Sequence, residues 1–476
     1  MDKDRIWILL ITACALFSYL TIVLGYFPYL GIATSLITLS SLVFFFKKNK
    51  SIFNLILYIL TLVFSFFIVY NSNLFLTFLN ILAVLLLGSL IALPKSELNL
   101  GFLQFLISPI TVFFEAFETP SDYKFKLSLK TNTQTYVEIG KSLLISVIIL
   151  LVILPLLASA NPFFNKLVAD VIEIFNLRIL LENLFSANYF VWLIRAFVFA
   201  ILTLFVPRLI TFINNSTVKQ LSITNPLSSV DLFLPKFLVC LIIFIFFITQ
   251  TQLYFASPET LQALGYSHSA YAREVFGQLS IVALVILGLI YNDKSKKKLS
   301  IMLSYFLVFE GIFLTFIALK SDYDYSLNWG FTYKRLWGFT GVFGILGIFV
   351  LYIQKCAEFV KGVILLISLL LIGVNIANFD YLIFHHRKST THSGTDYLYL
   401  SGLSSDSQSY GELLSMLEKI KQTNNLATRR VLTKINKLQK KYRQLDLRTF
   451  NFSEYLQYQK IKSIDAKYSS YITNLK

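Results

Sequence analysis

Long apolar runs alternate with short polar connections along most of the chain. A membrane-spanning helix needs about 20 apolar residues to cross a hydrocarbon core of about 30 Å. Eleven runs of this kind occur, at 6–24, 29–46, 52–70, 74–93, 143–158, 189–206, 237–255, 276–291, 301–318, 336–353 and 362–378. The pattern predicts an all-α fold: a polytopic transmembrane helical bundle of about 11 spans with a small helical C-terminal tail domain.

The first run has two interpretations. The stretch Ile11-Thr12-Ala13-Cys14 resembles a lipoprotein processing site, which would make the run a cleaved signal sequence. The apolar stretch, however, continues past Cys14 to Leu24, where a processed lipoprotein would become polar. We therefore expect an uncleaved helix.

Composition agrees with a membrane location. Of 476 residues, 56% are hydrophobic and only 14% are charged, which leaves too little polar surface for a soluble globular protein. Cys14, Cys240 and Cys356 lie in or beside apolar runs, so they provide neither a disulfide framework nor metal-ligand spacing.

The distribution of lysines predicts the orientation. Cytoplasmic loops of membrane proteins are enriched in Lys and Arg. The clusters at 47–50 and 294–298, with Lys355 and Lys361, fall on one side of an eleven-span bundle, whereas the loop 71–73 on the other side has no lysine. We expect a multi-pass protein of the cell membrane, with a cytoplasmic N-terminus and an extracytoplasmic tail.

Four regions follow from these spans. Residues 1–93 are expected to form a four-helix transmembrane part, and 94–141 a cytoplasmic or interfacial connector with an interfacial helix at 103–117. Residues 142–378 are expected to form a seven-helix transmembrane domain, and 379–476 a basic, mostly helical tail outside the membrane.

The tail carries helical patterns and half of the net charge. From Ala377 onward it has 16 Lys or Arg against 8 Asp or Glu, out of a net charge of +16 for the chain. Apolar residues recur at alternating spacings of four and three, which predicts one helix face: Val431, Ile435, Leu438, Tyr442 and Leu445. Further helices are predicted around 413–420 and 453–470. We expect a small bundle that lies against the membrane part.

The basic tail has several possible partners besides solvent. It could bind anionic lipid headgroups or another polymer of the cell envelope, because each Lys or Arg near an anionic surface contributes about 1 kcal/mol. No nucleic acid is expected, because the chain has no RNP, zinc-finger or helix-turn-helix signature.

Polar side chains within the spans, most of them toward the outer leaflet and Glu310 at mid-membrane, are the candidate site. A charge in hydrocarbon costs at least about 2.5–3.5 kcal/mol, so such residues normally face a partner or a watery cavity. The candidates for an outward-facing polar cavity are Arg195, Gln250, Gln252, Arg273, Glu274, Gln278, Glu310 and Arg335. We expect Glu310 to pair with Arg195 or Arg335. The alternative is that these are structural ion pairs and interfacial residues.

No catalytic signature accompanies them. The patterns G-x-x-x-x-G-K-[ST], H-E-x-x-H and G-x-S-x-G are absent, and the catalytic residues, if any, are unknown. Adjacent His385 and His386, with His392, could suggest a metal, but no helical i, i+4 pair of ligands is present. We expect an exposed loop, no metal and no cofactor.

Several segments resemble one known family. They read SANPFF at 159–164, YAREVFGQL at 271–279 and GFTYKRLW at 330–337, followed by NFD at 378–380, DYL at 396–398 and LSSD at 403–406. These segments are similar to bacterial multi-pass membrane proteins catalogued as domain of unknown function 4173. The resemblance implies architecture and location without an activity. Asn161 stands where that family usually has Asp.

Three classes of function remain. We expect an envelope binding or assembly protein with an outward-facing polar cavity. A membrane transporter is the first alternative, favoured by buried charges, although no inverted repeat is visible. A membrane enzyme acting on lipid-linked substrates of the outer leaflet is the second.

Overall fold

The structure is a computed structural model of the chain. It describes residues 29–47, 51–93, 108–114, 116, 205, 208–210, 212–213, 233–254, 282–291, 297–354, 359–387, 395–423, 425–444 and 449–462. The chain divides into two compact units, one of 1–25 with 114–212 and one of 26–113 with 213–476. Nearly all described residues belong to the second unit, which contains every helix named below.

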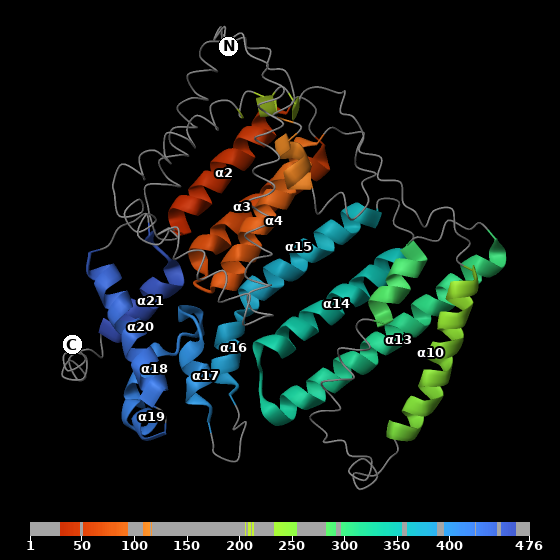
Figure 1. Ribbon diagram of the computed structural model, residues 1–476. Helices are drawn as coiled ribbons and strands as arrows, with labels where there is room; N and C mark the ends of the chain where they lie inside the picture. The colour runs from red at the N-terminus through yellow and green to blue at the C-terminus, as the bar shows by residue number, and fades with distance from the viewer. Residues whose placement is uncertain are drawn as a thin grey trace, which may run out of the picture. The chain divides into compact units, whose positions relative to one another are not determined.

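Three helices near the N-terminus pack side by side: α2 (Tyr29–Phe46), α3 (Ile52–Tyr70) and α4 (Leu74–Ala92) (Figure 1). Ser51 caps α3 by accepting a hydrogen bond from the Asn54 N–H, as polar N-cap residues do. At the far end of α4, the buried Lys47 donates to the carbonyl oxygens of Ile91 and Leu93. The lysine thereby satisfies carbonyls that the end of a helix leaves without partners.

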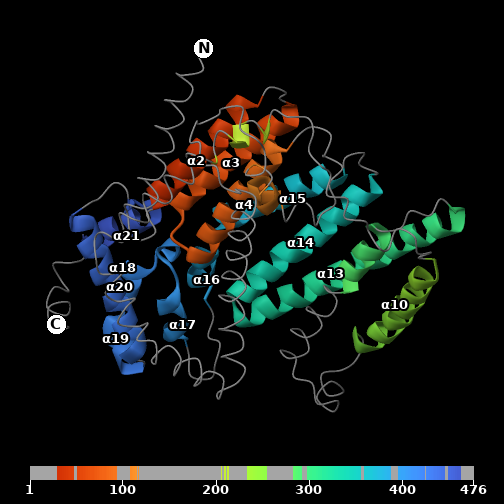
Figure 2. The ribbon, with the colours of Figure 1, turned by 45° about the horizontal axis from the view of Figure 1, so that its top comes forward.

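Four longer helices follow along the chain: α10 (Phe233–Tyr254), α13 (Lys298–Trp329), α14 (Tyr333–Ile353) and α15 (Phe359–Ala377). Each packs on the next in this order, and both views show α13, α14 and α15 as neighbouring rods (Figures 1 and 2). A shorter apolar helix spans Val282–Tyr291. Among the described residues, six helices are long and apolar enough to cross a membrane: α2, α3, α4, α13, α14 and α15.

Side-chain contacts show which helix ends lie together. At one end, the amine of Lys361 at the start of α15 lies 5.2 Å from the ring centroid of Phe53 at the start of α3. At the other end, Asn375 near the end of α15 is hydrogen-bonded to Asn71, just after α3. Helices α3 and α15 therefore run parallel, as two spans that both leave the same side of a membrane must.

The tail is a compact helical domain. It contains α16 (Phe379–His385), α17 (Tyr397–Gly402), a 3₁₀ turn η3 (Ser405–Ser407), α18 (Tyr410–Ser415), α19 (Leu417–Thr423), α20 (Asn425–Arg443) and α21 (Phe452–Lys462). Its core includes buried Val431, Ile435 and Leu438 from α20. Leu76 and Leu336, which belong to α4 and α14, are buried in the same core. The tail therefore packs directly on the ends of the membrane helices.

The predicted elements compare well with the observed ones. The runs 29–46 and 52–70 coincide with α2 and α3. The apolar stripe of the tail coincides with the buried face of α20 from Val431 to Tyr442, whereas Leu445 lies outside the described residues. The runs 6–24 and 143–158 lie outside the described residues, as does 189–206 apart from position 205. The all-helical fold and the multi-pass membrane architecture are confirmed, whereas the count of 11 spans stays a prediction.

Candidate functional site

Three tight turns lie at the end of the bundle where the tail packs. Gly330, with φ of 75°, ends α13, and Tyr333 begins α14 after a connection of two further residues. Asn378, with φ of 50°, caps α16 and places Asp380 in its first turn. Ser404 caps η3, which carries Asp406. Glycine and asparagine adopt a left-handed backbone more readily than other residues, so the first two turns fix where Tyr333 and Asp380 project.

Asp380 connects three separate segments. Its carboxylate accepts hydrogen bonds from the Asn73 amide at 2.7 Å, from the backbone N–H of Ser404 at 3.0 Å, and from the hydroxyl of Tyr333. Asp380 is only 1% exposed. A buried carboxylate is tolerated only with such partners, because an unpaired one would lose its hydration without replacement.

Asp406 connects the tail to the loop between α3 and α4. It accepts hydrogen bonds from the Ser72 N–H at 2.7 Å, the Ser72 hydroxyl at 2.9 Å and the Asn73 N–H at 2.9 Å. Burial raises the pKa of Asp406 above its ordinary value, and the hydrogen bonds from Ser72 act in the opposite direction. The loop 71–73 is thus held by a carboxylate from more than 300 residues further along the chain.

Asparagine amides extend the same network. Asn375 on α15 exchanges hydrogen bonds with Asn80 on α4 at 2.8 and 2.9 Å and accepts one from Asn71 at 2.6 Å. Asn451, just before α21, donates to the Asn71 carbonyl oxygen at 2.7 Å. All four asparagines are at most 2% exposed. We call the connected residues the polar junction: Asn71, Ser72, Asn73, Asn80, Tyr333, Asn375, Asp380, Asp406 and Asn451.

Lys434 supports the turn that carries Asp406 from the tail side. Its amine donates to the carbonyl oxygens of Ser401 at 2.7 Å and Leu403 at 2.6 Å. Burial lowers the pKa of this amine to about 8, and the nearby Asp380 opposes that effect. Because the carboxylates and amides of the junction bond to protein groups, the arrangement works as a clamp between the tail and the membrane helices.

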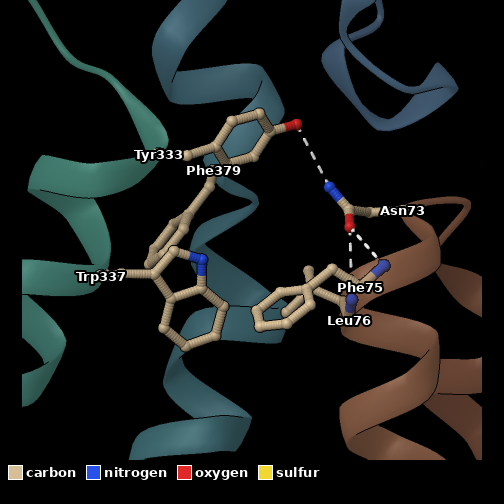
Figure 3. Close-up of a pocket in the computed structure, with 6 residues that line it drawn as sticks. All are labelled: Asn73, Phe75, Leu76, Tyr333, Trp337 and Phe379. Atoms are coloured by element: carbon tan, nitrogen blue, oxygen red, sulfur yellow. Dashed lines mark hydrogen bonds between the residues drawn. The ribbon is translucent and has the colours of Figure 1, made fainter. Parts of the chain in front are cut away.

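A pocket opens beside the polar junction. It has a volume of about 340 Å³ and is lined by Asn73, Phe75, Leu76, Tyr333, Trp337 and Phe379 (Figure 3). The Trp337 ring meets the rings of Phe75 and Phe379 edge to face, each with centroids 5.3 Å apart. The volume is at the lower end of the range found for small-molecule pockets, and the walls are mainly aromatic.

The polar groups of the pocket differ in whether they are already bonded. The amide of Asn73 caps α4 through its oxygen and donates to Tyr333 and Asp380 through its nitrogen. The indole N–H of Trp337, by contrast, has no hydrogen-bond partner among the residues the structure describes, and it lies on the side of the ring facing Tyr333 and Asn73 (Figure 3). The pocket therefore offers one available donor within an apolar wall.

Of the residues predicted from the sequence for a polar cavity, only Arg335 and Glu310 have described side chains, and neither is among the described residues that line the pocket. Arg195, Arg273, Glu274 and Gln278 are outside the described residues, and only the helical backbone of Gln250 and Gln252 is described, in α10. Arg335 on α14 donates to the Gly330 carbonyl oxygen and acts electrostatically on Asp322 near the end of α13.

Glu310 lies in the middle of α13 and is 1% exposed. One carboxylate oxygen accepts a hydrogen bond from the Cys240 thiol of α10 at 3.7 Å between heavy atoms, and the other has no partner among the described residues. One turn before Cys240, the fully buried Lys236 donates to Ser300 and Ser304. The predicted pairing of Glu310 with Arg335 is therefore wrong, because neither Glu310 oxygen contacts that guanidinium. Arg195 lies outside the described residues, so a pairing with it stays a prediction.

His385 and His386 lie at the end of α16 and are both exposed. The His385 ring stacks on Tyr381 with centroids 3.8 Å apart. Within the described part of the chain, no three His, Cys, Asp or Glu side chains form a group that could hold a metal ion. His385 and His386 are thus exposed, as predicted, but the predicted loop is wrong at these two positions, because α16 includes His385 and ends at its cap His386.

Sequence reasoning missed the polar junction as a site. In the sequence analysis, Tyr333, Asp380 and Asp406 appear only within the segments that resemble a known family. Asn73 appears only as part of the loop 71–73, which has no lysine. One sequence feature could have indicated the site. Three of the family-like segments each contain a turn-forming residue followed two or three positions later by a hydroxyl or carboxyl side chain: GFTYKRLW, NFD and LSSD. What periodicity cannot supply is the contact between the tail and a loop more than 300 residues earlier.

The chain belongs to the family described as domain of unknown function (DUF4153), whose family model matches residues 56–413. The matched range includes every residue of the polar junction except Asn451. No curated protein and no solved structure matches the chain. The resemblance to a family of unknown function is therefore confirmed in kind. Membership in domain of unknown function 4173 in particular stays a prediction.

Proposed function

We propose that the protein is an envelope binding protein of the cell membrane, whose ligand is an amphiphilic lipid or lipid-linked component held in the pocket beside the polar junction. The observation that carries the proposal is the aromatic pocket with one available N–H donor, which lies between membrane helices and a tail that is hydrogen-bonded to them. With the tail outside the cell, the site would serve components of the outer leaflet.

The surroundings of the pocket favour a ligand from the bilayer. Leu74, Phe75 and Phe78 on α4 are 54–65% exposed, and α4 is apolar enough to span a membrane. Their side chains would meet lipid, so an acyl or isoprenoid chain can approach the pocket sideways without crossing water. An aromatic wall next to the helix end is also typical of the interfacial layer.

The single donor favours an oxygen on the ligand near its apolar chain. An indole N–H that faces hydrocarbon lacks an acceptor, because lipid chains offer none. An ester or phosphate-linked oxygen next to an apolar chain supplies an acceptor at the right depth. Because the pocket is small for a whole lipid, it would hold the part of the chain closest to the headgroup.

The test is photo-crosslinking with a lipid that carries a diazirine near its ester group. The full-length protein in bilayers should be labelled on the peptides that contain Phe75, Trp337 or Phe379. Trp337→Phe keeps an aromatic ring and removes the donor, so labelling there should fall about fivefold, as expected for one hydrogen bond of about 1 kcal/mol. The control Phe78→Leu changes a lipid-facing residue outside the pocket and should leave the labelling unchanged.

Two results would contradict the proposal. Labelling of these peptides at equal yield in wild type and Trp337→Phe would show that the indole does not hold the ligand. Labelling spread evenly over all lipid-facing helices would show that the pocket is not preferred over the bulk bilayer.

A transporter remains the second candidate, on one specific observation. Lys236 and Glu310 are buried ionisable groups between α10 and α13, and buried ionisable residues of membrane helices often mark ion or proton pathways. Uptake into proteoliposomes that is lost in Glu310→Gln would favour this function. Uptake that is absent, or unchanged in that variant, would remove it.

A further inference from the structure

The outer face of α20 is the most basic surface among the described helices of the tail. Five of its side chains are exposed cations: Arg429, Arg430, Lys437, Lys440 and Arg443. At 100° per residue they fall within an arc of about 140°, and the helix has no Asp or Glu. The opposite face, with Val431, Ile435 and Leu438, is buried in the core of the tail.

These cations have no internal counter-charges. Their side chains make no ion pair or hydrogen bond with any residue the structure describes. The acidic side chains described in the tail are all engaged elsewhere: Asp380 and Asp406 in the junction, Asp396 capping α17, Glu412 with Arg387 and Glu454 with Lys441. The face is therefore available to an external anion.

The end of α20 lies next to the start of a membrane helix. The amine of Lys441, at the edge of the basic arc, is 5.2 Å from the ring centroid of Tyr29, the first residue of α2. Phe452, at the start of α21, stacks on Tyr70, the last residue of α3, with centroids 5.3 Å apart. This part of the tail is therefore held at the level where the spans leave the hydrocarbon.

The distances match the headgroup layer. With a rise of 1.5 Å per residue, Lys437, Lys440 and Arg443 lie within about 6 Å of Lys441 along the axis of α20. The polar layer on each side of a bilayer is roughly 5–8 Å thick. Arg429 and Arg430 continue the same face further along the helix.

We propose that the outer face of α20 is a binding surface for the anionic phosphate headgroups of the bilayer that holds the protein. This surface is separate from the pocket and does not depend on the ligand proposed for it. Headgroup binding would hold the tail close to the membrane and enrich anionic lipid beside α2.

The experiment compares two double variants of the full-length protein in nanodiscs that contain mainly zwitterionic lipid and a minor share of anionic phospholipid. Native mass spectrometry gives the ratio of the two lipids that stay bound. Lys437→Gln with Lys440→Gln tests the proposed face. Lys421→Gln with Lys462→Gln removes the same charge from exposed positions on α19 and at the end of α21.

We expect the lipid bound to wild type and to the control variant to be enriched in anionic lipid. In the Lys437/Lys440 variant this enrichment should fall by at least about threefold, because each cation near an anionic surface contributes binding free energy. Raising the salt concentration should weaken the enrichment. Neither double variant changes a residue that lines the pocket, so a difference between them reports on the face of α20 and not on the pocket.

Absence of enrichment in wild type, or equal enrichment in both double variants, would overturn the proposal. So would a third result: salt-sensitive retention of wild type on an immobilised polyanion that is lost in the Lys437/Lys440 pair, without any lipid enrichment. That outcome would identify a soluble anionic polymer as the partner of the face in place of the bilayer.

Discussion

At the scale of single residues, the polar junction is stable because its buried carboxylates and amides are matched to donors. Asp380 and Asp406 together accept hydrogen bonds from three side chains and three backbone N–H groups. Leaving one buried acceptor or donor unpaired costs about 1–3 kcal/mol, so small chemical changes here have large effects.

Asp406→Asn is predicted to loosen the tail. The amide keeps one acceptor oxygen, but its NH₂ group would face an N–H donor where the second oxygen now accepts. We expect a loss of about 2 kcal/mol in the stability of the docked tail. Faster hydrogen exchange at the Ser72 and Asn73 amides, followed by mass spectrometry, would report it.

Asp396→Asn is the matched control for this substitution. Asp396 is exposed and caps α17, and asparagine is as good an N-cap as aspartate. Exchange at Ser72 and Asn73 should therefore match wild type. Equal protection in Asp406→Asn and wild type would mean that the carboxylate does not hold the loop.

At the scale of elements, apolar periodicity is sufficient to predict the helices, because a spanning helix must be continuous and apolar. The observed α2 and α3 begin and end at the predicted residues. In α13 the predicted run 301–318 is too short, since the helix continues to Trp329 through polar residues such as Asp322. Apolarity marks the hydrocarbon depth, whereas the helix ends only at Gly330.

Glycines determine how closely α13, α14 and α15 pack. A Cβ at Gly311 of α13 would overlap the ring of Phe349, which is fully buried on α14. At Gly347 of α14 a Cβ would come within 2.6 Å of Leu366 on α15. Gly341 has open space within 4 Å. The glycines of these helices therefore contribute unequally to close packing.

Gly311→Ala is predicted to destabilise the α13–α14 pair by about 1–3 kcal/mol, because the buried ring has little room to move. Gly341→Ala should be neutral or slightly stabilising, since alanine favours a helix over glycine. Thermal unfolding in detergent would compare the two. A lower unfolding temperature for Gly341→Ala than for Gly311→Ala would show that the helices pack differently.

At the scale of the whole molecule, the junction relates the sidedness of distant segments. Asp406 and Asn451 of the tail bond to the loop 71–73, so the tail and this loop must lie on the same side of the membrane. The starts of α3 and α15 meet at the opposite end. The sequence predicts from lysine counts that the tail and the loop 71–73 share one side of the membrane. In the structure the same conclusion follows from the hydrogen bonds of Asp406 and Asn451 to that loop.

Reporter fusions after residue 73 and after residue 476 are therefore predicted to lie on the same side of the membrane. Fusions after residues 50 and 296 are predicted to lie on the other side. Because lysines concentrate at 47–50 and 294–298, we expect the first pair outside the cell and the second pair in the cytoplasm. Paired reporters, one active only outside and one only in the cytoplasm, would measure it.

The possible results separate two claims. If both pairs are inverted, the junction stands, but the pocket and the basic face of α20 would serve the inner leaflet and cytoplasmic ligands. If residue 73 and residue 476 report different sides, the tail cannot be clamped to the loop, because a hydrogen-bonded, buried contact cannot span a bilayer. In that case the polar junction, and with it the binding function proposed for the pocket, would have to be abandoned.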